Sequence, residues 1–418
     1  MGVRRLRFHD EISRLRSRDD AIRFFASVAD CSYEGLRMRR LGMPLVKSYL
    51  VETVPCHDGS RQDPELCFRG SGLTLEPMDD ALYKVTTDDR GLFALAEEIT
   101  PRIIAIYTAE ESRVADRLLR NAVASTPRLD HAWFSGTYLT TFWKTLIPTI
   151  PGRSAVRMRF QHEDLFGYGE QVPTEGREDE GLFDQALSEE PPLERCASSI
   201  EITMRAADLV EALPAVSLSL KPMNAMGVLR IPSVVHPGGN ELYHDGKITN
   251  RTSNYQDHRL EVVGIASQYT DATCNLESIA WTSTESVSMQ ADSGINVQAT
   301  PVLIEFADPL ELDTFRTFVA RTFEEGSRPF RLWGTPIWLG ARKAHVYGLD
   351  LHLFQKFMME LTPEYIELFL PRGTCGNTLH RLVTNLQRYV SPRLSVWVGD
   401  QPYEDLIRKA LEGGRADD

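Results

Sequence analysis

The chain has 418 residues, of which 42% are hydrophobic and 25% are charged, and its formal net charge is −13. A chain of this length and composition can bury a sizeable core, and we expect it to form two or three domains. The negative net charge disfavours proteins whose main task is to bind the phosphates of nucleic acids.

The sequence contains no signal that predicts export or membrane insertion. No stretch approaches the roughly 18 uninterrupted apolar residues of a membrane span, and the charged N-terminus lacks the apolar centre of a signal peptide. The six cysteines are scattered without a CxxC pair, which indicates reduced thiols. We therefore expect a cytoplasmic protein without membrane association. Since only eight of the 46 basic residues are lysines, we also expect a GC-rich, bacterial source.

The first part of the chain alternates helical and strand-like patterns. Residues 8–29 have apolar side chains at helical spacing. In the Arg-rich opening, residues 4–20, the arginines are interleaved with acids, which favours a solvated helix face over a contact with nucleic acid or an acidic protein surface. Strand-like segments follow at Val46–Val54 and Ala81–Thr86. Arg102–Tyr107 is a predicted buried strand, and a helix is expected to begin near Glu111.

An acidic segment then interrupts the pattern. Residues 163–194 contain eleven acidic residues and one arginine, with several Gly and Pro. Such a composition buries little surface, so residues 166–195 are a predicted linker or mobile loop. The prediction separates an N-terminal α+β domain, residues 1–165, from a strand-rich C-terminal α+β domain, residues 196–418, with a further division near residue 300 as an alternative.

The C-terminal part is predicted to be mostly strands with single helices between them. Gly227–Ala299 looks strand-rich, with Ser, Thr and Asn at its turns. Further expected elements are a strand and helix at Ser199–Met204 and Ala206–Leu213, a strand at Val302–Phe306 before a capped helix, strands between Phe330 and Leu370, a helix at Thr378–Val390 and a strand at Leu394–Val398. The fold class is therefore α+β, with largely antiparallel sheets.

Common motifs for nucleotide and metal chemistry are missing. The sequence has no GxxxxGK[ST] loop, no GxGxxG after a predicted strand, no HExxH and no GxSxG. These absences lower the expectation of nucleotide-dependent and zinc-protease chemistry, but a site whose residues are dispersed in sequence stays open. No cofactor is predicted.

A candidate catalytic cluster lies near the C-terminus. Asp350 and His352 would share one face of a strand, so that the carboxylate could orient the imidazole as a general base. Cys375 precedes a predicted helix whose dipole would lower a thiol pKa, and His380 follows one turn later. Cys375 as nucleophile, with His352 or His380 as base, is one hypothesis. The alternative is that GTCGNT only forms a strand-to-helix turn.

A second candidate is the glycine-rich segment VVHPGGNELYHDGKITN and the residues that follow it. His236, His244 and Asp245, together with Asp257 and His258, offer imidazole and carboxylate ligands to a divalent metal. Their spacing matches no standard ligand pattern. A solvated hairpin with incidental histidines is the alternative.

Two classes of function follow. The first is a non-enzymatic interaction or scaffold component of a bacterial multi-protein system, with one or more protein partners. Assigning that system to defence would be a guess about gene context. The second class is a hydrolase that uses the Cys/His/Asp cluster or the His-rich loop. The sequence does not decide whether the protein is an enzyme.

Overall fold

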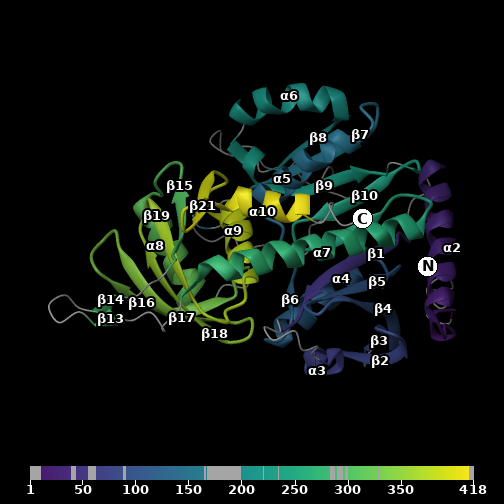
Figure 1. The fold of residues 1–418 in the computed structure, drawn as a ribbon, viewed down its shortest axis with the longest axis horizontal. Helices are drawn as coiled ribbons and strands as arrows, with labels where there is room; N and C mark the ends of the chain where they lie inside the picture. The colour runs from purple at the N-terminus through teal and green to yellow at the C-terminus, as the bar shows by residue number, and fades with distance from the viewer. Residues whose placement is uncertain are drawn as a thin grey trace, which may run out of the picture.

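The computed structural model describes residues 11–38, 44–54, 63–87, 91–163, 166, 199–219, 221–233, 235–282, 288–289, 295–296, 300–326 and 329–413. Two antiparallel sheets with helices packed against them form an α+β fold, as the sequence predicts (Figure 1). Within these residues, no helix has the length and apolar character that crossing a membrane requires.

The first sheet has eleven strands in the order β2-β3-β4-β5-β1-β11-β10-β9-β7-β8, with β6 beside β1, and all its pairs are antiparallel. The strands are β1 (Lys47–Glu52), β2 (Leu73–Asp79), β3 (Leu82–Thr87), β4 (Gly91–Thr100), β5 (Ile103–Thr108), β6 (Asp130–His131), β7 (Ala155–Gln161), β8 (Ser199–Arg205), β9 (Met226–Pro232), β10 (Gly239–Tyr243) and β11 (Lys247–Asn250).

The middle of this sheet is covered on both faces. Alternate residues of β5 belong to two separate apolar cores, so that Tyr107 faces one and Ile106 the other. Helix α4 (Ser112–Ser125) packs on the second of these faces, whereas α2 (Arg18–Arg37) and α7 (Tyr255–Ala280) pack on the first. Burial on both faces explains why β5 is an unbroken apolar run, and the predicted strand and following helix are confirmed.

The second sheet has the strand order β16-β17-β18-β19-β15-β20-β21, and the short β12 pairs in parallel with β19. Its strands are β12 (Trp281–Thr282), β15 (Val302–Phe306), β16 (Leu332–Trp338), β17 (Ala344–Asp350), β18 (Gln355–Leu361), β19 (Tyr365–Pro371), β20 (Leu394–Val398) and β21 (Gln401–Pro402). One face packs on α8 (Leu312–Val319) and α9 (Asn377–Tyr389) in a continuous core.

The remaining described elements are short or peripheral. They are α3 (Pro64–Phe68), α5 (Gly136–Leu146), α6 (Ala206–Ser219), α10 (Tyr403–Gly413), the single turns η1 (Ile147–Thr149), η2 (Lys221–Asn224) and η4 (Ala320–Glu324), and the two-stranded ribbon of β13 (Ser288–Met289) and β14 (Ile295–Asn296).

The prediction for Gly227–Ala299 was wrong in part, because α7 occupies 26 residues of it. Asn254 caps this helix by accepting hydrogen bonds from the backbone N–H groups of Gln256 and Asp257. The buried positions recur at helical spacing, but several are polar, among them His258, Thr273 and Glu277. The apolar periodicity that announces a helix is therefore weak here. Helix α7 runs beside both sheets (Figure 1).

The strands group differently from the predicted domains. Strands β8 to β11 follow the acidic segment in sequence, yet they complete the same sheet as β1 to β7, and β8 pairs directly with β7. The predicted linker, residues 166–195, lies outside the described residues except for Phe166. The change from the first sheet to the second comes after β11, closer to the alternative division near residue 300. The domain limits stay a prediction.

We predict that Phe25→Ala destabilises the fold by about 3–5 kcal/mol, because the Phe25 ring is fully buried between α2 and α7 and lies stacked on Tyr255, 5.0 Å away. Urea unfolding measures the change. The neighbouring Phe24→Ala is the matched control, since Phe24 is only partly buried. Equal losses in the two variants would contradict this account of how α2 packs.

Candidate functional site

A network of charged side chains is buried where the two sheets meet. It has seven members, and the side chain of each is at most 11% exposed. We call them the buried ion-pair network: Glu52, Arg102, Asp130, Glu277, Arg331, Asp350 and Arg381. Charged groups are rarely buried unless they are paired and hydrogen-bonded, so each pairing matters to the fold.

One half of the network is centred on Arg102, which directly precedes β5. Its Nε donates to Oε1 of Glu52 at the end of β1, at 2.8 Å. The two terminal nitrogens hold Glu277 of α7 in a fork, with Nη2 2.8 Å from Oε1 and Nη1 3.3 Å from Oε2. This bidentate geometry is the strongest form of the arginine–carboxylate pair. The first sheet is thereby tied to α7.

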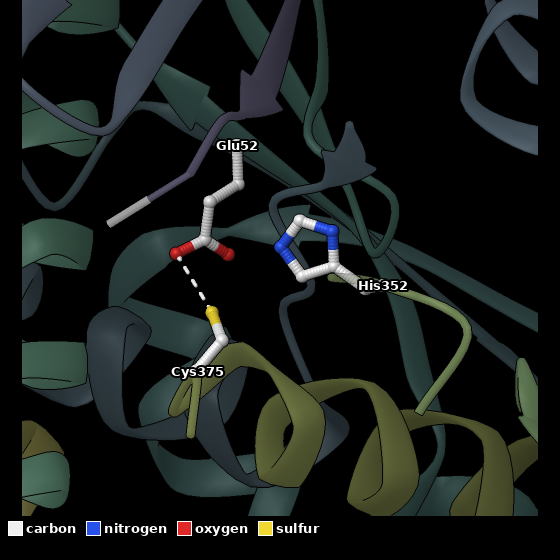
Figure 2. Close-up of side chains that lie close together, drawn as sticks. All are labelled: Glu52, His352 and Cys375. Carbon is white, nitrogen blue, oxygen red and sulfur yellow. Dashed lines mark hydrogen bonds between the residues drawn. The ribbon is translucent and has the colours of Figure 1, made fainter. Parts of the chain in front are cut away.

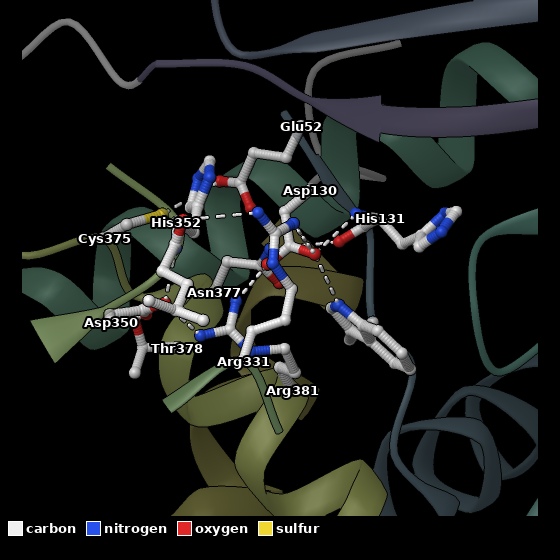
Figure 3. Close-up of polar contacts among 12 residues, drawn as sticks. Glu52, Asp130, His131, Arg331, Asp350, His352, Cys375, Asn377, Thr378 and Arg381 are labelled. Carbon is white, nitrogen blue, oxygen red and sulfur yellow. Dashed lines mark hydrogen bonds and ion pairs between the residues drawn. The ribbon is translucent and has the colours of Figure 1, made fainter. Parts of the chain in front are cut away.

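The other half is centred on Arg381 of α9. Its guanidinium donates to Asp130 of β6 and to Asp350 of β17, while its Nε donates to the carbonyl of Phe330 at 2.8 Å. Arg331 approaches Asp130 from the other side, at 3.4 Å (Figure 3). Burial alone would raise the pKa of Asp130, but the guanidinium groups of Arg381 and Arg331 hold it well below its usual range. A strand of each sheet is thus joined to one helix.

Backbone N–H groups at the N-terminus of α9 donate to side chains of the same region. The N–H of Gly376 donates to Oε1 of Glu277 at 2.7 Å, and the N–H of Cys375 donates to Oε1 of Gln355 at 2.6 Å. A carboxylate here satisfies an orphan donor and complements the helix dipole. Gly376 permits the approach, because a Cβ there would lie 2.9 Å from Cγ of Glu277.

The prediction that Asp350 and His352 are neighbours on one strand face was wrong. Strand β17 ends at Asp350, and His352 lies in the turn that follows. Asp350 accepts the backbone N–H of His352 at 2.8 Å, together with bonds from Thr378 and Arg381, so it does not orient the imidazole. Instead, Nδ1 of His352 lies 3.0 Å from the carbonyl of Pro127. The chain forms a turn after Asp350, where we expected the strand to continue.

His352 and Cys375 do come together, and Glu52 completes the group (Figure 2). One ligand atom from each of the three lies within 4.8 Å of the others, and all three residues are buried. Cys375 precedes α9 as predicted, but its thiol is not activated. Burial and the nearby Glu52 carboxylate raise the pKa of Cys375 well above its usual value. Burial lowers the pKa of His352 to about 4. These residues could hold a metal ion.

His380 lies on a different side of α9. Its Nδ1 is 2.5 Å from the hydroxyl of Tyr403, and its ring packs among Tyr138, Tyr269 and Tyr403. Burial lowers its pKa to about 3. The structure therefore does not place His380 as a base beside Cys375.

The four residues predicted as a metal loop have separate partners. His236 contacts Asn254 and Asp257, and His244 accepts from the guanidinium of Arg388. His258 lies between Ser48 and Asn240, at 2.7 Å from each, and Asp245 accepts a backbone N–H from Lys247. Within the described part of the chain, only Glu52, His352 and Cys375 gather as three metal-ligand side chains.

Sequence reasoning missed most of the buried ion-pair network. A signal was available in part: Arg381 lies among the apolar residues Leu379 and Leu382 of the predicted helix, and Arg102 directly precedes an apolar strand. A charge inside an apolar pattern often marks a buried pair. The partners themselves are up to 251 residues away in sequence, so they could not be assigned without the fold.

A second feature is the face of the second sheet that points away from α8 and α9. Cross-strand register places Trp333, Ile337, Tyr347 and Trp397 on this face, and they are 49%, 50%, 58% and 37% exposed. Half-buried apolar residues lie between them: Leu303, Leu349, Met358 and Phe369. We call these eight residues the open face.

We predict that Arg381→Met destabilises the chain by about 3–5 kcal/mol, because it removes the guanidinium from buried Asp350 and leaves Asp130 with only its longer contact to Arg331. Arg393→Met is the control, since the Arg393–Asp308 pair is exposed and should contribute under ~1 kcal/mol. Unfolding by urea compares the two. A loss for Arg381→Met as small as that of the control would contradict the assigned role.

A second prediction concerns pH. Burial raises the pKa of Glu52 from 4.5 to about 7, so between these values the folded chain keeps a proton that the unfolded chain has lost. The contribution of Glu52 to stability is therefore full below pH 4.5 and is lost as pH rises through 7. In metal-free protein, the unfolding free energy of the wild type should fall by on the order of 2 kcal/mol more than that of Glu52→Gln over this range. If the unfolding free energies of the wild type and Glu52→Gln changed in parallel with pH, this prediction would be wrong.

Comparisons with known proteins identify a family. The protein MJECL33 of Methanocaldococcus jannaschii, titled "Uncharacterized protein MJECL33", is 29% identical over 150 residues. The aligned region covers 35% of this chain and only about a third of that protein, 34%. That relative is archaeal, and the bacterial source stays a prediction. No solved structure matches the chain. The profile of the MJECL33-like protein family matches residues 36–404, and the chain belongs to that family.

Proposed function

We propose that the chain is a non-enzymatic interaction component of a multi-protein system and that it binds a protein partner through the open face. The observation that carries the proposal is the gathering of exposed aromatic and aliphatic side chains on one face of the second sheet. Contiguous exposed apolar surface is uncommon on a monomer and marks interaction sites, and Trp and Tyr dominate the binding energy of interfaces.

The edge strand β16 favours a partner that packs on the open face over a partner that adds a strand to the sheet. Strand β16 is the outermost strand of the described sheet, but Pro336 lies within it, opposite Val346. Proline lacks the N–H that an added strand would need, and natural edge strands use it to prevent such pairing. A partner that packs its own side chains onto Trp333, Tyr347 and Trp397 avoids this obstacle.

Charge suggests which kind of partner fits. Glu367 lies directly across from Leu303 on this face, and Glu305 is two residues further along β15. Elsewhere on this face, Glu360 is paired with Lys343 at 2.7 Å, and exposed Lys356 lies directly across from Leu349. Among the described residues, the unpaired acids are therefore at the β15 end of the face. We infer a partner with an apolar patch bordered by Lys or Arg. A second copy of this chain would bring the same acids face to face, which like-charge repulsion disfavours.

A hydrolase that uses Cys375 is the second candidate, since His352 lies beside the thiol. Two observations favour the interaction component over it. Cys375 and His352 are each 0% exposed, and the raised pKa of Cys375 keeps the thiol protonated at neutral pH. Cys375→Ala should therefore leave partner binding unchanged, whereas loss of a measured hydrolysis in that variant would favour the hydrolase.

The same proposal includes the cellular compartment and the source of the protein. Cys31, Cys274 and Cys375 are free thiols, which supports the expectation of a reducing, cytoplasmic compartment. A bacterial source rests on the predominance of arginine over lysine alone.

The test compares the wild type with the triple variant Trp333→Ser, Tyr347→Ser, Trp397→Ser. A partner captured from an extract of the source organism is identified, produced separately and titrated. We predict that the triple variant weakens binding at least ~100-fold, since each aromatic anchor contributes on the order of 2 kcal/mol. Glu305→Gln with Glu367→Gln should slow association and reduce its salt dependence.

The matched control is the double variant Leu66→Ser, Leu260→Ser, which removes exposed apolar side chains far from the second sheet in sequence. Circular dichroism checks that all variants fold. The proposal is overturned if the triple variant binds the partner like the control does. A dimer in sedimentation analysis that only the triple variant disrupts would assign the open face to a second copy and overturn the inferred partner.

A further inference from the structure

We propose that Glu52, His352 and Cys375 form a binding site for a divalent transition-metal ion of the zinc type. Glu52 ends β1 of the first sheet, His352 lies in the turn after β17 of the second sheet, and Cys375 directly precedes α9. A metal held by all three would link the two sheets at the point where the buried ion-pair network joins them.

Two unpartnered acceptors point into this group. Oε2 of Glu52 and Nε2 of His352 are buried and have no hydrogen-bond partner. Figure 2 shows the imidazole turned toward the carboxylate, with the thiol of Cys375 on the third side. When Glu52 is ionised, two buried acceptors face each other without a donor between them, and leaving both lone pairs unsatisfied is costly. A cation satisfies both at once.

Each ligand is already held in the state that a metal requires. Nδ1 of His352 lies 3.0 Å from the carbonyl of Pro127, so Nδ1 carries the proton and the lone pair of Nε2 is free. Arg102 holds Oε1 of Glu52 at 2.8 Å and leaves Oε2 available. Nη2 of Arg102 also lies 3.5 Å from Sγ of Cys375 and can support a thiolate. Outer contacts of this kind accompany natural metal sites.

The charges balance when a divalent ion is present. A bound divalent ion compensates one carboxylate and one thiolate, and forming the thiolate releases the proton of Sγ. Arg102 keeps its second partner, Glu277, which balances its own charge.

The donor set selects the metal class. One thiolate, one imidazole and one carboxylate suit zinc or cobalt, whereas magnesium and calcium prefer sites made of oxygen atoms. Three protein ligands leave a fourth position of a tetrahedral ion for a water molecule. Because the three residues are each 0% exposed, we assign the ion a structural role in holding the sheets together.

The test uses the full chain, freed of metal with a chelator and titrated with cobalt(II) and then with zinc(II). We predict one equivalent of cobalt, an ultraviolet thiolate-to-cobalt charge-transfer band, displacement of that band by zinc, and a higher unfolding temperature with zinc bound. Binding should release protons, so the affinity should rise with pH.

Cys375→Ser and His352→Gln should each weaken zinc binding at least ~100-fold, at the upper end of effects seen when a metal site is altered. Cys274→Ser is the matched control, because its Sγ also contacts Arg102, at 3.4 Å, but it lies outside the ligand group. His236→Gln is the control for the histidine.

Three results would overturn the proposal. They are a wild type that binds less than half an equivalent of cobalt or zinc, a charge-transfer band that survives in Cys375→Ser, and a band that is lost in Cys274→Ser. If a ligand variant fails to fold, X-ray absorption of the zinc-loaded wild type decides, since it must show one sulfur neighbour together with nitrogen or oxygen. Partner binding by the open face is measured independently of these outcomes.

Discussion

The fold depends on charges that have been taken out of water and paired where the two sheets meet. Arg381 carries the main contact, because a single guanidinium from α9 reaches Asp130 in one sheet and Asp350 in the other. Removing one partner from a buried ion pair leaves a charge without compensation, which costs a large part of the net stability of a typical domain. These charged side chains can be buried between the sheets only if each carboxylate meets its arginine. The ion pairs therefore fix how the two sheets meet.

The same requirement explains the position of the thiol and imidazole. Cys375 and Gly376 start α9, and their N–H groups are satisfied by Gln355 and Glu277. This anchors the helix end beside Glu52, which Arg102 holds in place. Residues of β1, α7, the turn after β17 and α9 thus converge on one small volume. The open face lies on the other side of the second sheet, so the buried centre and the exposed surface are separate parts of the molecule.

Local patterns predicted much of the fold. The apolar run of β5, the helix α4 that follows it and the strands from β16 to β19 could all be predicted, because one face or both faces of each element are apolar. Helix α7 could not, since His258, Thr273 and Glu277 interrupt its buried stripe. Those polar residues are buried only because partners far away in the sequence satisfy them, as Ser48 does for His258.

The candidate site was predicted less completely than the fold. Cys375 and His352 were recognised by residue type, and the structure brings them together. Glu52 completes the group from a strand that reads as an ordinary apolar segment, and His380 is directed into an aromatic cluster by the turn of α9. Sheet topology decides which side chains converge. The strand was expected to continue to Leu353, but β17 ends at Asp350, so Asp350 and His352 do not share a strand face.

The central claim is that the buried ion-pair network makes one cooperative unit of the two sheets, and hydrogen–deuterium exchange tests it most directly. The account predicts that amides of β1, β5, β17 and the N-terminal turn of α9 exchange only through global unfolding, with a common opening free energy in both sheets. It would be contradicted if the second sheet and α9 exchanged through an earlier opening while β1 and β5 stayed protected.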